Sequence, residues 1–353
     1  MMARTSGSTF TIIVFAVLLV AAIAAPFFFY PQFVMRGLCL ALFACAFNLL
    51  LGYVGLLSFG HAAFFGFAAY VTGHMAKVGT INLPYPSFSG EWNWLTIPLP
   101  PLTPELAILS GALAAAILGF IAGYIAIRRQ GIYFAMVTLA LAQMLYFFCL
   151  QAPFTHGEDG IQAIPRGLLF GVIDLNDSLT MYYFVLAVFI AGFLIIQRTI
   201  HSPFGQTIKA IRENEARAIS LGYNADRYKL LAFVISAMLA GVAGSLFALV
   251  FQIATLNNVH WHTSGEVVLM TLLGGMGTVL GPVVGAFFVA GLQQYLAAYG
   301  AWVSIIQGII FVVCVLLFRR GIVGEIIALI PRAKSERPVD DALSGATAAH
   351  GAE

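Results

Sequence analysis

Charged residues are scarce in this sequence. Only 9% of the 353 residues are Asp, Glu, Lys or Arg, whereas 61% are hydrophobic, and the mean hydropathy is +0.94. Soluble domains carry roughly 25% charged residues, so the shortage excludes a soluble globular protein and indicates an integral membrane protein. The net charge of +2 says nothing about nucleic acid. In a membrane protein the positions of the basic residues matter more than their sum.

Motifs for catalysis or for a bound cofactor are also lacking. The sequence contains neither a G-x-x-x-x-G-K-[ST] loop for nucleotide phosphates nor an H-E-x-x-H zinc motif. Its four cysteines lie in apolar runs without metal-ligand spacing, which is typical of buried, inert thiols. They are Cys39, Cys45, Cys149 and Cys314. We therefore expect no enzyme activity, no metal and no cofactor in this chain, and a membrane-bound enzyme is a remote alternative.

Carboxylates are nearly absent from the middle of the apolar runs. Glu266 lies at the predicted outer mouth of its run, and Arg36 lies near the outer end of another. Proton- or sodium-coupled carriers usually place carboxylates in mid-membrane as relays. This shortage argues against a self-sufficient secondary carrier or channel, which remains the alternative from a different class, and it favours transport powered from outside the chain.

Long apolar runs, in contrast, are abundant. A bilayer core of about 30 Å needs about 20 apolar residues per helix, so the runs predict an all-α polytopic membrane protein with ten transmembrane helices. The first run is about 20 residues long, which exceeds the apolar region of a signal peptide. The predicted spans are residues 10–30, 33–51, 56–76, 105–127, 131–151, 181–197, 228–254, 265–280, 283–299 and 302–318.

The distribution of Lys and Arg predicts the orientation of these spans. With residues 198–229 inside, fourteen basic residues are cytoplasmic and three, Arg36, Lys77 and Arg166, are outside. Such an excess of positive charge on one side favours cytoplasmic N- and C-termini. The long outer loop 77–104 is rich in Pro and Trp, which predicts an irregular loop with interfacial aromatic anchors, and the other long outer loop is 152–180. We assign residues 1–330 to a transmembrane permease domain and 331–353 to a disordered cytoplasmic tail.

Residues 198–229 are the only long charge-dense segment between two apolar runs. We call them the docking segment. Ser202 suits an N-cap, Pro203 suits the first helical position, and Gly222 suits a left-handed stop. Apolar residues recur at helical spacing between these ends, at Ile208, Ile211, Ala218 and Ile219. The pattern predicts an amphipathic helix that docks a cytoplasmic partner. The alternative is a solvated loop that carries positive charge.

Polar residues and glycines inside the spans are candidates for a solute path, because a buried polar group must be paired or face water. The candidates are Asn48, Ser58, His61, Gln143, Gly274, Gly275 and Gly277. Gly55–Gly60 (GLLSFG) and Leu272–Gly277 (LLGGMG) lie five spans apart, as an inverted five-plus-five repeat requires. Chance similarity of glycine-rich pieces is the alternative, and Ser58 with its glycines also fits a capped, closely packed helix start. Residues 265–299 are either two spans or one broken helix.

Three stretches together resemble LivM-type permease subunits of branched-chain amino acid ABC importers. They are GYVGLLSFGHAAFFGFAAYV (52–71), RRQGIYFAMVTLALAQM (128–144) and the block 201–288, which contains IKAIRENEARAISLGYNADRYKLLAFVISAMLAGVAGSL and LLGGMGTVLGPVVGA. The last block is similar to the cytoplasmic "EAA" loop of ABC permeases. Only one alanine follows Glu215 here, so the general pattern fits loosely and the LivM version fits better.

The resemblance implies a heterodimer with a LivH-like second permease, two cytoplasmic ATP-binding subunits and a periplasmic substrate-binding protein, in the bacterial inner (plasma) membrane with no nucleic acid. It also implies that ATP binding moves the docking segment and switches the pathway from outward- to inward-open. The residues matched to the ATPase contact are Lys209, Arg212, Glu213, Glu215, Ala216, Arg217 and Gly222. The implied substrates are leucine, isoleucine and valine, with urea, short amides or aromatic acids as alternatives within the class.

Overall fold

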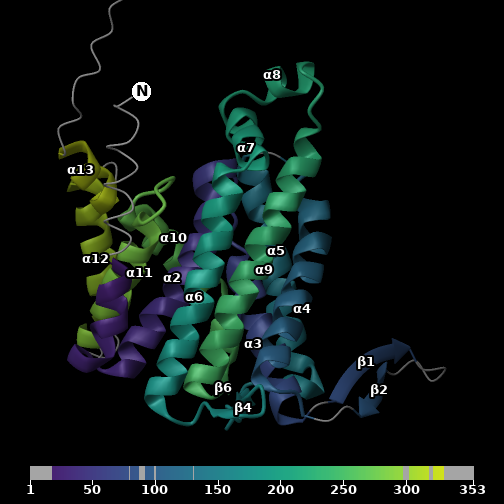
Figure 1. The fold of residues 1–353 in the computed structure, drawn as a ribbon. Helices are drawn as coiled ribbons and strands as arrows, with labels where there is room; N and C mark the ends of the chain where they lie inside the picture. Colours follow the sequence, from purple (N-terminus) through teal and green to yellow (C-terminus); the bar gives the residue numbers. More distant parts are fainter. Residues whose placement is uncertain are drawn as a thin grey trace, which may run out of the picture.

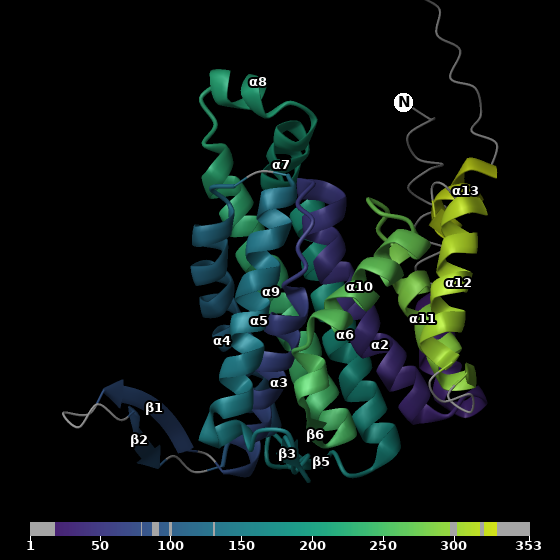
Figure 2. The same ribbon diagram turned by 180° about the vertical axis from the view of Figure 1, so that it is seen from behind.

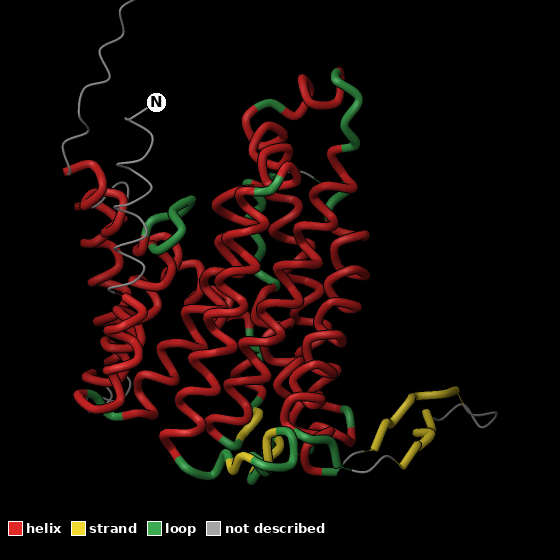
Figure 3. Tube along the Cα trace, in the orientation of Figure 1, coloured by secondary structure: helices red, strands yellow, loops and turns green. Residues whose placement is uncertain are grey.

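Helices dominate the part of the chain that the computed structural model describes, which is residues 18–78, 80–86, 92–98, 101–129, 131–296, 302–317 and 321–329 (Figures 1 and 3). Five segments are long and apolar enough to cross a membrane. They are α2 (Pro31–Asn48) with its extension η1 (Leu49–Val54), α4 (Pro104–Ala126), α5 (Ile132–Gln151), α6 (Ser178–His201) and α9 (Ala225–Phe251).

Shorter helices complete the bundle. They are Leu18–Phe28, α3 (His61–Lys77), α10 (Trp261–Gly274), α11 (Gly281–Leu296), α12 (Trp302–Leu317) and α13 (Gly321–Leu329). Every predicted span thus contains a helix, although the crossing of the membrane by ten of them stays a prediction. The described part of the predicted pair 265–299 contains two helices, α10 and α11, with a break at residues 275–280. The predicted tail 331–353 and the first part of the first span lie outside the described residues.

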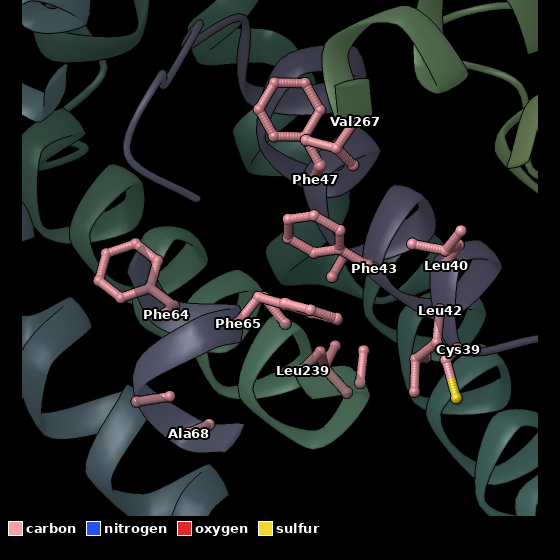
Figure 4. Packing of buried hydrophobic residues seen from close by; sticks show 14 of the residues in the cluster. Cys39, Leu40, Leu42, Phe43, Phe47, Phe64, Phe65, Ala68, Leu239 and Val267 are labelled. Carbon is pink, nitrogen blue, oxygen red and sulfur yellow. The ribbon is translucent and has the colours of Figure 1, made fainter. Parts of the chain in front are cut away.

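Helix α2 lies at the centre of the molecule. In the most apolar 18-residue stretch of α2 and η1, 94% of the residues are buried. The helix is apolar on every side, so neighbouring helices can pack around its whole circumference. The rings of Phe43 and Phe65 lie 4.7 Å apart between α2 and α3, and Figure 4 shows them among the other buried side chains of this cluster. Cys39, Cys45 and Cys149 are free and buried, as predicted for inert thiols.

Close packing of α3, α4 and α9 depends on small residues. A Cβ on Gly244 would lie 1.9 Å from the carbonyl oxygen of Phe65, and a Cβ on Gly111 would lie 2.3 Å from the hydroxyls of Thr72 and Ser245. Thr72 Oγ1 donates a hydrogen bond of 2.7 Å to Ser245 Oγ. Small side chains and hydroxyl pairs of this kind let helices approach closely where no water drives their association.

Short strands gather at one end of the bundle. β1 (Thr80–Pro86) pairs antiparallel with β2 (Trp92–Pro98), and this hairpin projects from the bundle in Figures 1 and 2. The predicted irregular loop 77–104 is therefore wrong in part. A two-stranded ribbon has a free edge on each strand, where the missing N–H of proline costs nothing. The other pairs are β3 (Ile161–Gln162) with β6 (Ile253–Ala254) and β4 (Leu168–Leu169) with β5 (Ile173–Asp174).

Basic residues lie at both ends of the bundle, but their surroundings differ. At the strand end Lys77 Nζ donates to Gln162 O at 2.7 Å, and Arg166 Nη2 donates to Val250 O at 2.8 Å. Burial lowers the pKa of Arg166 from its usual value. At the opposite end Arg128 lines a cavity of about 270 Å³ together with Asp226 and Arg227. The docking segment and Arg128 thus share one end, which agrees with the orientation predicted from charge.

Candidate functional site

The docking segment begins with α7 (Pro203–Glu213). Ser202 is its N-cap, and Ser202 Oγ accepts a hydrogen bond of 3.2 Å from the Gly205 N–H. Pro203 occupies the first helical turn, where no N–H partner is needed. Ile208 is buried against the main core of the bundle, whereas Ile211 is buried in a small cluster with Ala218 and Ala225. The predicted start of the helix is confirmed.

The helix does not continue through the segment, so the prediction of a single helix is wrong. Asn214 has an extended backbone (φ −154°, ψ 96°) and ends α7. Its Oδ1 then accepts a hydrogen bond of 2.9 Å from the Arg217 N–H and caps a second helix, α8 (Glu215–Ser220). An asparagine side chain can replace a backbone partner in this way, which makes it a good cap and a poor interior residue. Gly222 follows with φ +90°, as predicted for a left-handed stop.

α8 turns much of its apolar surface outward. Ala218 is buried, but Ile219 is 56% exposed and Leu221, just past the helix, is 70% exposed. Ile219, one of the apolar positions at helical spacing, is thus not covered by the bundle. Glu213, Ala216 and Arg217 are also exposed. Next to α8 lies an open cavity of about 350 Å³, lined by Ile219, Gly222, Tyr223, Asn224, Ala225 and Asp226.

An ion pair ties α8 to the start of α9. Lys229 Nζ lies 2.5 Å from Glu215 Oε1, and the side chain of Lys229 is only 9% exposed. The two residues are fourteen positions apart, beyond any spacing within one helix, so sequence reasoning did not predict the pair. An ion pair with one mostly buried partner fixes geometry more firmly than a surface pair does. α8 is therefore held in a defined position.

α7 also contacts the end of α2. There α2 continues into η1, a π-helix, and a π-helical turn often marks a functional site. Arg212 Nη1 donates a hydrogen bond to the Gly52 carbonyl of η1. Lys209 Nζ lies 5.4 Å from the centre of the Tyr53 ring, within range of a cation–π interaction. Two of the predicted coupling residues thus touch η1.

η1 in turn meets the turn between α10 and α11. Asn48 Oδ1 accepts a hydrogen bond of 2.9 Å from the Gly277 N–H, and Asn48 Nδ2 donates one of 2.9 Å to Thr278 O. A Cβ on Gly52 would lie 2.6 Å from Gly277 N. The end of α2 and η1 therefore lie against the second of the two glycine-rich pieces, Leu272–Gly277, and Asn48 is hydrogen-bonded to it.

Glycine is required in this turn. Gly275 has φ +115° and Gly277 has φ +77°, a backbone conformation that other residues rarely adopt. A Cβ on Gly274 would lie 1.9 Å from Gly281 O. The structure thus brings four of the predicted path residues together, namely Asn48, Gly274, Gly275 and Gly277.

Ser58 and His61 form a second, separate cluster at the start of α3. Both side chains are fully buried. Ser58 Oγ accepts from the Gly60 N–H at 3.3 Å, and His61 Nε2 lies 2.8 Å from Ser236 Oγ, which donates to Ala46 O at 2.6 Å. These contacts are those of a closely packed helix start, as in the alternative interpretation from the sequence, but the N-cap of α3 is Gly60 and Ser58 does not cap the helix.

Little space is left near this second cluster. A cavity of about 20 Å³ is lined by residues of α3, α4, α5 and α9, including Gly60, Thr138 and Phe233. This volume suits about one water molecule. Gln143 is half-buried on α5, and among the described residues no hydrogen bond joins it to the other path candidates. In this conformation the bundle is closed around His61.

Metal ligands do not converge anywhere in the described ranges: no group of three His, Cys, Asp or Glu side chains is placed to hold an ion.

Comparison with known proteins agrees with the resemblance in sequence. A family model described as "Branched-chain amino acid transport system / permease component" matches residues 29–315. The high-affinity branched-chain amino acid transport system permease protein LivM of Escherichia coli is 27% identical over 298 residues, which are 78% of this chain and 65% of that protein. The chain thus matches less than two thirds of LivM. No solved structure matches.

Other relatives carry different names. The autoinducer 2 import system permease protein LsrC of Klebsiella pneumoniae is 30% identical over 211 residues, or 57% of this chain and 58% of that protein. The xylose transport system permease protein XylH of Escherichia coli is 28% identical over 181 residues, or 47% and 44%. The family model covers most of the chain and the helices are apolar. This multi-pass membrane protein therefore belongs to the family described as "Branched-chain amino acid transport system / permease component".

Proposed function

We propose that this chain is a transmembrane permease subunit of an ABC importer that carries leucine, isoleucine and valine across the inner membrane. It pairs with a LivH-like second permease, binds two cytoplasmic ATP-binding subunits and receives substrate from a periplasmic binding protein. The observation that carries this proposal is the pair α7–α8, in which one helix contacts η1 and the next presents apolar side chains outward.

The exposed side of α8 fits a protein partner. Leu221 and Ile219 lie at the tip of a segment rich in charge, at the end where Arg128 and Arg227 also lie. Basic residues favour the cytoplasmic side, which is where ATP-binding subunits work. Apolar side chains rimmed by polar ones are typical of protein interaction sites. Glu213, Ala216 and Arg217 would surround the contact.

Contacts lead from α8 to the middle of the bundle. α8 is fixed to α9 by the Glu215–Lys229 pair, and α7 is fixed to η1 through Arg212. One turn before Gly52, Asn48 holds the glycine turn between α10 and α11. ATP-driven closure of the partner subunits would displace α8, and packed and hydrogen-bonded groups would carry this displacement to the glycine turn. Packed helices of this kind switch between two discrete conformations.

The substrate assignment depends on the relatives. LivM is named for branched-chain amino acids, whereas LsrC and XylH are named for autoinducer 2 and xylose. LivM matches over the larger share of this chain, and this favours amino acids. Urea, short amides or aromatic acids remain alternatives within the same class.

Uptake measurements test the proposal. Proteoliposomes that hold the complete transporter should accumulate labelled leucine only with ATP and the binding protein present. Liposomes that hold this chain alone should not concentrate leucine under a proton or sodium gradient. Accumulation by the chain alone would overturn the proposal and make it a secondary carrier.

Orientation can be tested by thiol labelling. Asn176, just before α6, and Asn214, between α7 and α8, are both exposed. The start of α6 and the α7–α8 pair lie at opposite ends of the bundle (Figure 1), and the native Cys39, Cys45 and Cys149 are buried. A cysteine at position 176 should react with an impermeant reagent from the periplasm, and one at position 214 only from the cytoplasm. The reverse labelling would overturn the orientation of the docking segment.

A further inference from the structure

Three polar side chains from three helices form a continuous row. Arg36 Nη2 on α2 donates a hydrogen bond of 2.7 Å to Gln293 Oε1 on α11. Gln293 Nε2 donates one of 2.7 Å to Glu266 Oε1 on α10. Arginine can only donate and a carboxylate can only accept, so the orientation of the amide is fixed. We call these three residues the polar row.

The polar row reaches some depth along the bundle rather than lying at its outer end. The turn before α10 lies against the middle of α3, because a Cβ on Gly66 would lie 2.5 Å from Val259 N. Gly66 is about 16 Å along α3 from Lys77, at 1.5 Å per residue. Glu266, seven positions after Val259, is therefore deeper than the outer mouth predicted from the sequence.

A charged pair at this depth is costly unless it is matched. Arg36 and Glu266 nevertheless make no direct ion pair in the described structure, since the amide of Gln293 lies between them. Arg36 Nε is buried without a hydrogen-bond partner. His262 adds only a contact of 3.8 Å to Glu266. The two charges are thus bridged by a neutral amide rather than paired, and one N–H of the guanidinium has no partner.

The amide shows which ligand would fit between the two charges. It offers an acceptor to Arg36 and a donor to Glu266 on adjacent atoms. An α-amino acid offers the same pattern with full charges, a carboxylate for Arg36 and an ammonium for Glu266. Charge-assisted hydrogen bonds are roughly twice as strong as neutral ones, and a guanidinium can bind a carboxylate with two N–H groups. The unpartnered Arg36 Nε supplies the second donor.

Access and connection also fit a substrate site. All three side chains are only half-buried, and the neighbouring Trp261 and His262 are exposed. The helices of the polar row are those that meet at the glycine turn, because α2 carries Asn48 and the turn joins α10 to α11. Asn48 is about 18 Å along α2 from Arg36. A ligand between Arg36 and Glu266 would therefore contact the same helices that the docking segment reaches from the other side.

We propose that Arg36 and Glu266 bind the carboxylate and the ammonium of an α-amino acid zwitterion during its passage, and that the amide of Gln293 occupies this position between substrates. The inference rests on the proposed function. It assigns recognition of the shared α-carbon groups to the polar row and leaves selection of the side chain to other contacts.

Protection of a cysteine tests the site directly. In the complete transporter with Cys314→Ser, Gln293→Cys should react with a small methanethiosulfonate reagent. Leucine at about ten times its dissociation constant should slow this reaction about tenfold, because only the unoccupied fraction reacts. Two analogues of leucine each lack one of the charged groups: its α-keto acid lacks the ammonium, and the amine left when leucine loses its carboxylate lacks the carboxylate. At the same concentration, neither analogue should slow the reaction more than about twofold. Gln294→Cys, at the exposed neighbouring position, should react equally with and without leucine.

Adding Glu266→Gln should abolish protection of the cysteine at position 293. Glu158→Gln, which changes an exposed carboxylate far along the chain, should leave protection intact. An unchanged rate at the Gln294→Cys control would show that the Glu266 variant is folded. Equal protection by all three compounds, protection that survives Glu266→Gln, or a position 293 that no reagent reaches would overturn the site.

Leucine uptake by the unmodified transporter separates the two proposals. Uptake without protection of position 293 would overturn the polar row as a site and leave the proposed function standing. Absence of leucine uptake would overturn the proposed function and the site that depends on it.

Discussion

α7 and α8 are successive helices of one polar segment, and they share a small buried cluster of Ile211, Ala218 and Ala225, but the rest of their surroundings differ. α7 buries Ile208 and Ile211 and reaches η1 through Arg212. α8 buries Ala218, while Ile219 is exposed. The sequence pattern is continuous through both helices, so the difference arises at the residue between them.

Asn214 turns the second half of the segment away from the bundle. In one unbroken helix, Ile208 and Ile219 would lie eleven positions apart, close to three full turns, and would face the same side. The extended backbone at Asn214 removes that alignment. One half of the segment can then contact the bundle while the other half contacts a partner. Variants that affect only one half should therefore have different consequences.

The largest effect is expected from reversing the ion pair that holds α8. Glu215→Lys would place a second cation beside the mostly buried Lys229. Loss of the pair should cost about 2–3 kcal/mol of local stability, allowing for the partial exposure of Glu215. We expect leucine uptake and ATPase coupling to be abolished while membrane insertion persists, as measured by uptake, ATP hydrolysis and yield in the membrane.

Glu158→Lys is the matched control for this change. Glu158 is exposed at the strand end of the bundle, away from the docking segment, and no ion pair involves it among the described residues. The same charge reversal there should reduce uptake far less. Equal loss in both variants would mean that added positive charge, rather than the position of α8, causes the loss.

The second-largest effect is expected at Asn48, at the end of α2, next to the η1 segment that α7 contacts. Asn48→Ala would leave the Gly277 N–H and the Thr278 carbonyl without their partner. An unsatisfied buried group costs about 1–3 kcal/mol, so uptake should fall about tenfold or more at unchanged ATPase binding. Cys45→Ala removes a buried atom three positions earlier without breaking a hydrogen bond and should keep most uptake. Similar losses in both would indicate a packing defect instead.

A smaller effect is expected from the outward side of α8. Leu221→Ser should change the free energy of unfolding by no more than about 0.5 kcal/mol, because the side chain is exposed. Loss of its burial against a partner should weaken ATPase binding by about 1–2 kcal/mol, or roughly tenfold. Co-purification of the ATPase with the permease measures this. Val172→Ser, an exposed apolar position at the strand end, should have no effect, and weakening there would argue against a specific interface.

The helices were predicted well because each apolar run has the length and composition of a membrane helix. In an apolar surrounding the backbone must satisfy its own hydrogen bonds, and a helix does so within one segment. The hairpin of β1 and β2 was missed because prolines and tryptophans were interpreted as loop signals. The turn before α10 was missed for another reason. Its approach to Gly66 depends on packing between distant residues, which no local pattern records.

The candidate site was predicted only where the signal was local. Ser202 and Gly222 act through their immediate neighbours, and both have the predicted roles. Asparagine is favoured at helix caps, so Asn214 is a local signal for a break in the docking segment, and the prediction of a single helix did not use it. The pairs Glu215–Lys229 and Asn48–Gly277 join residues from different elements. Their geometry follows from the fold, so spacing in the sequence could not predict them.

The smallest effect is expected from the cation–π contact between α7 and η1. Lys209→Gln would remove the charge that lies 5.4 Å from the centre of the Tyr53 ring. Such contacts contribute about 0.5–1 kcal/mol at partly exposed sites, so uptake should fall about two- to fivefold. Arg212 continues to hold α7 against η1 in this variant, which limits the loss.

A double-mutant cycle decides whether the contact with Tyr53 is the cause. Tyr53→Leu keeps an apolar side chain in place but removes the ring face. If the contact transmits motion from α7, leucine uptake by the double variant should be no lower than uptake by the less active of the two single variants. Either change alone already breaks the interaction. Additive losses would mean that Lys209 and Tyr53 act independently. The connection between the docking segment and η1 would then rest on Arg212, and Arg212→Gln should account for the whole loss of coupling.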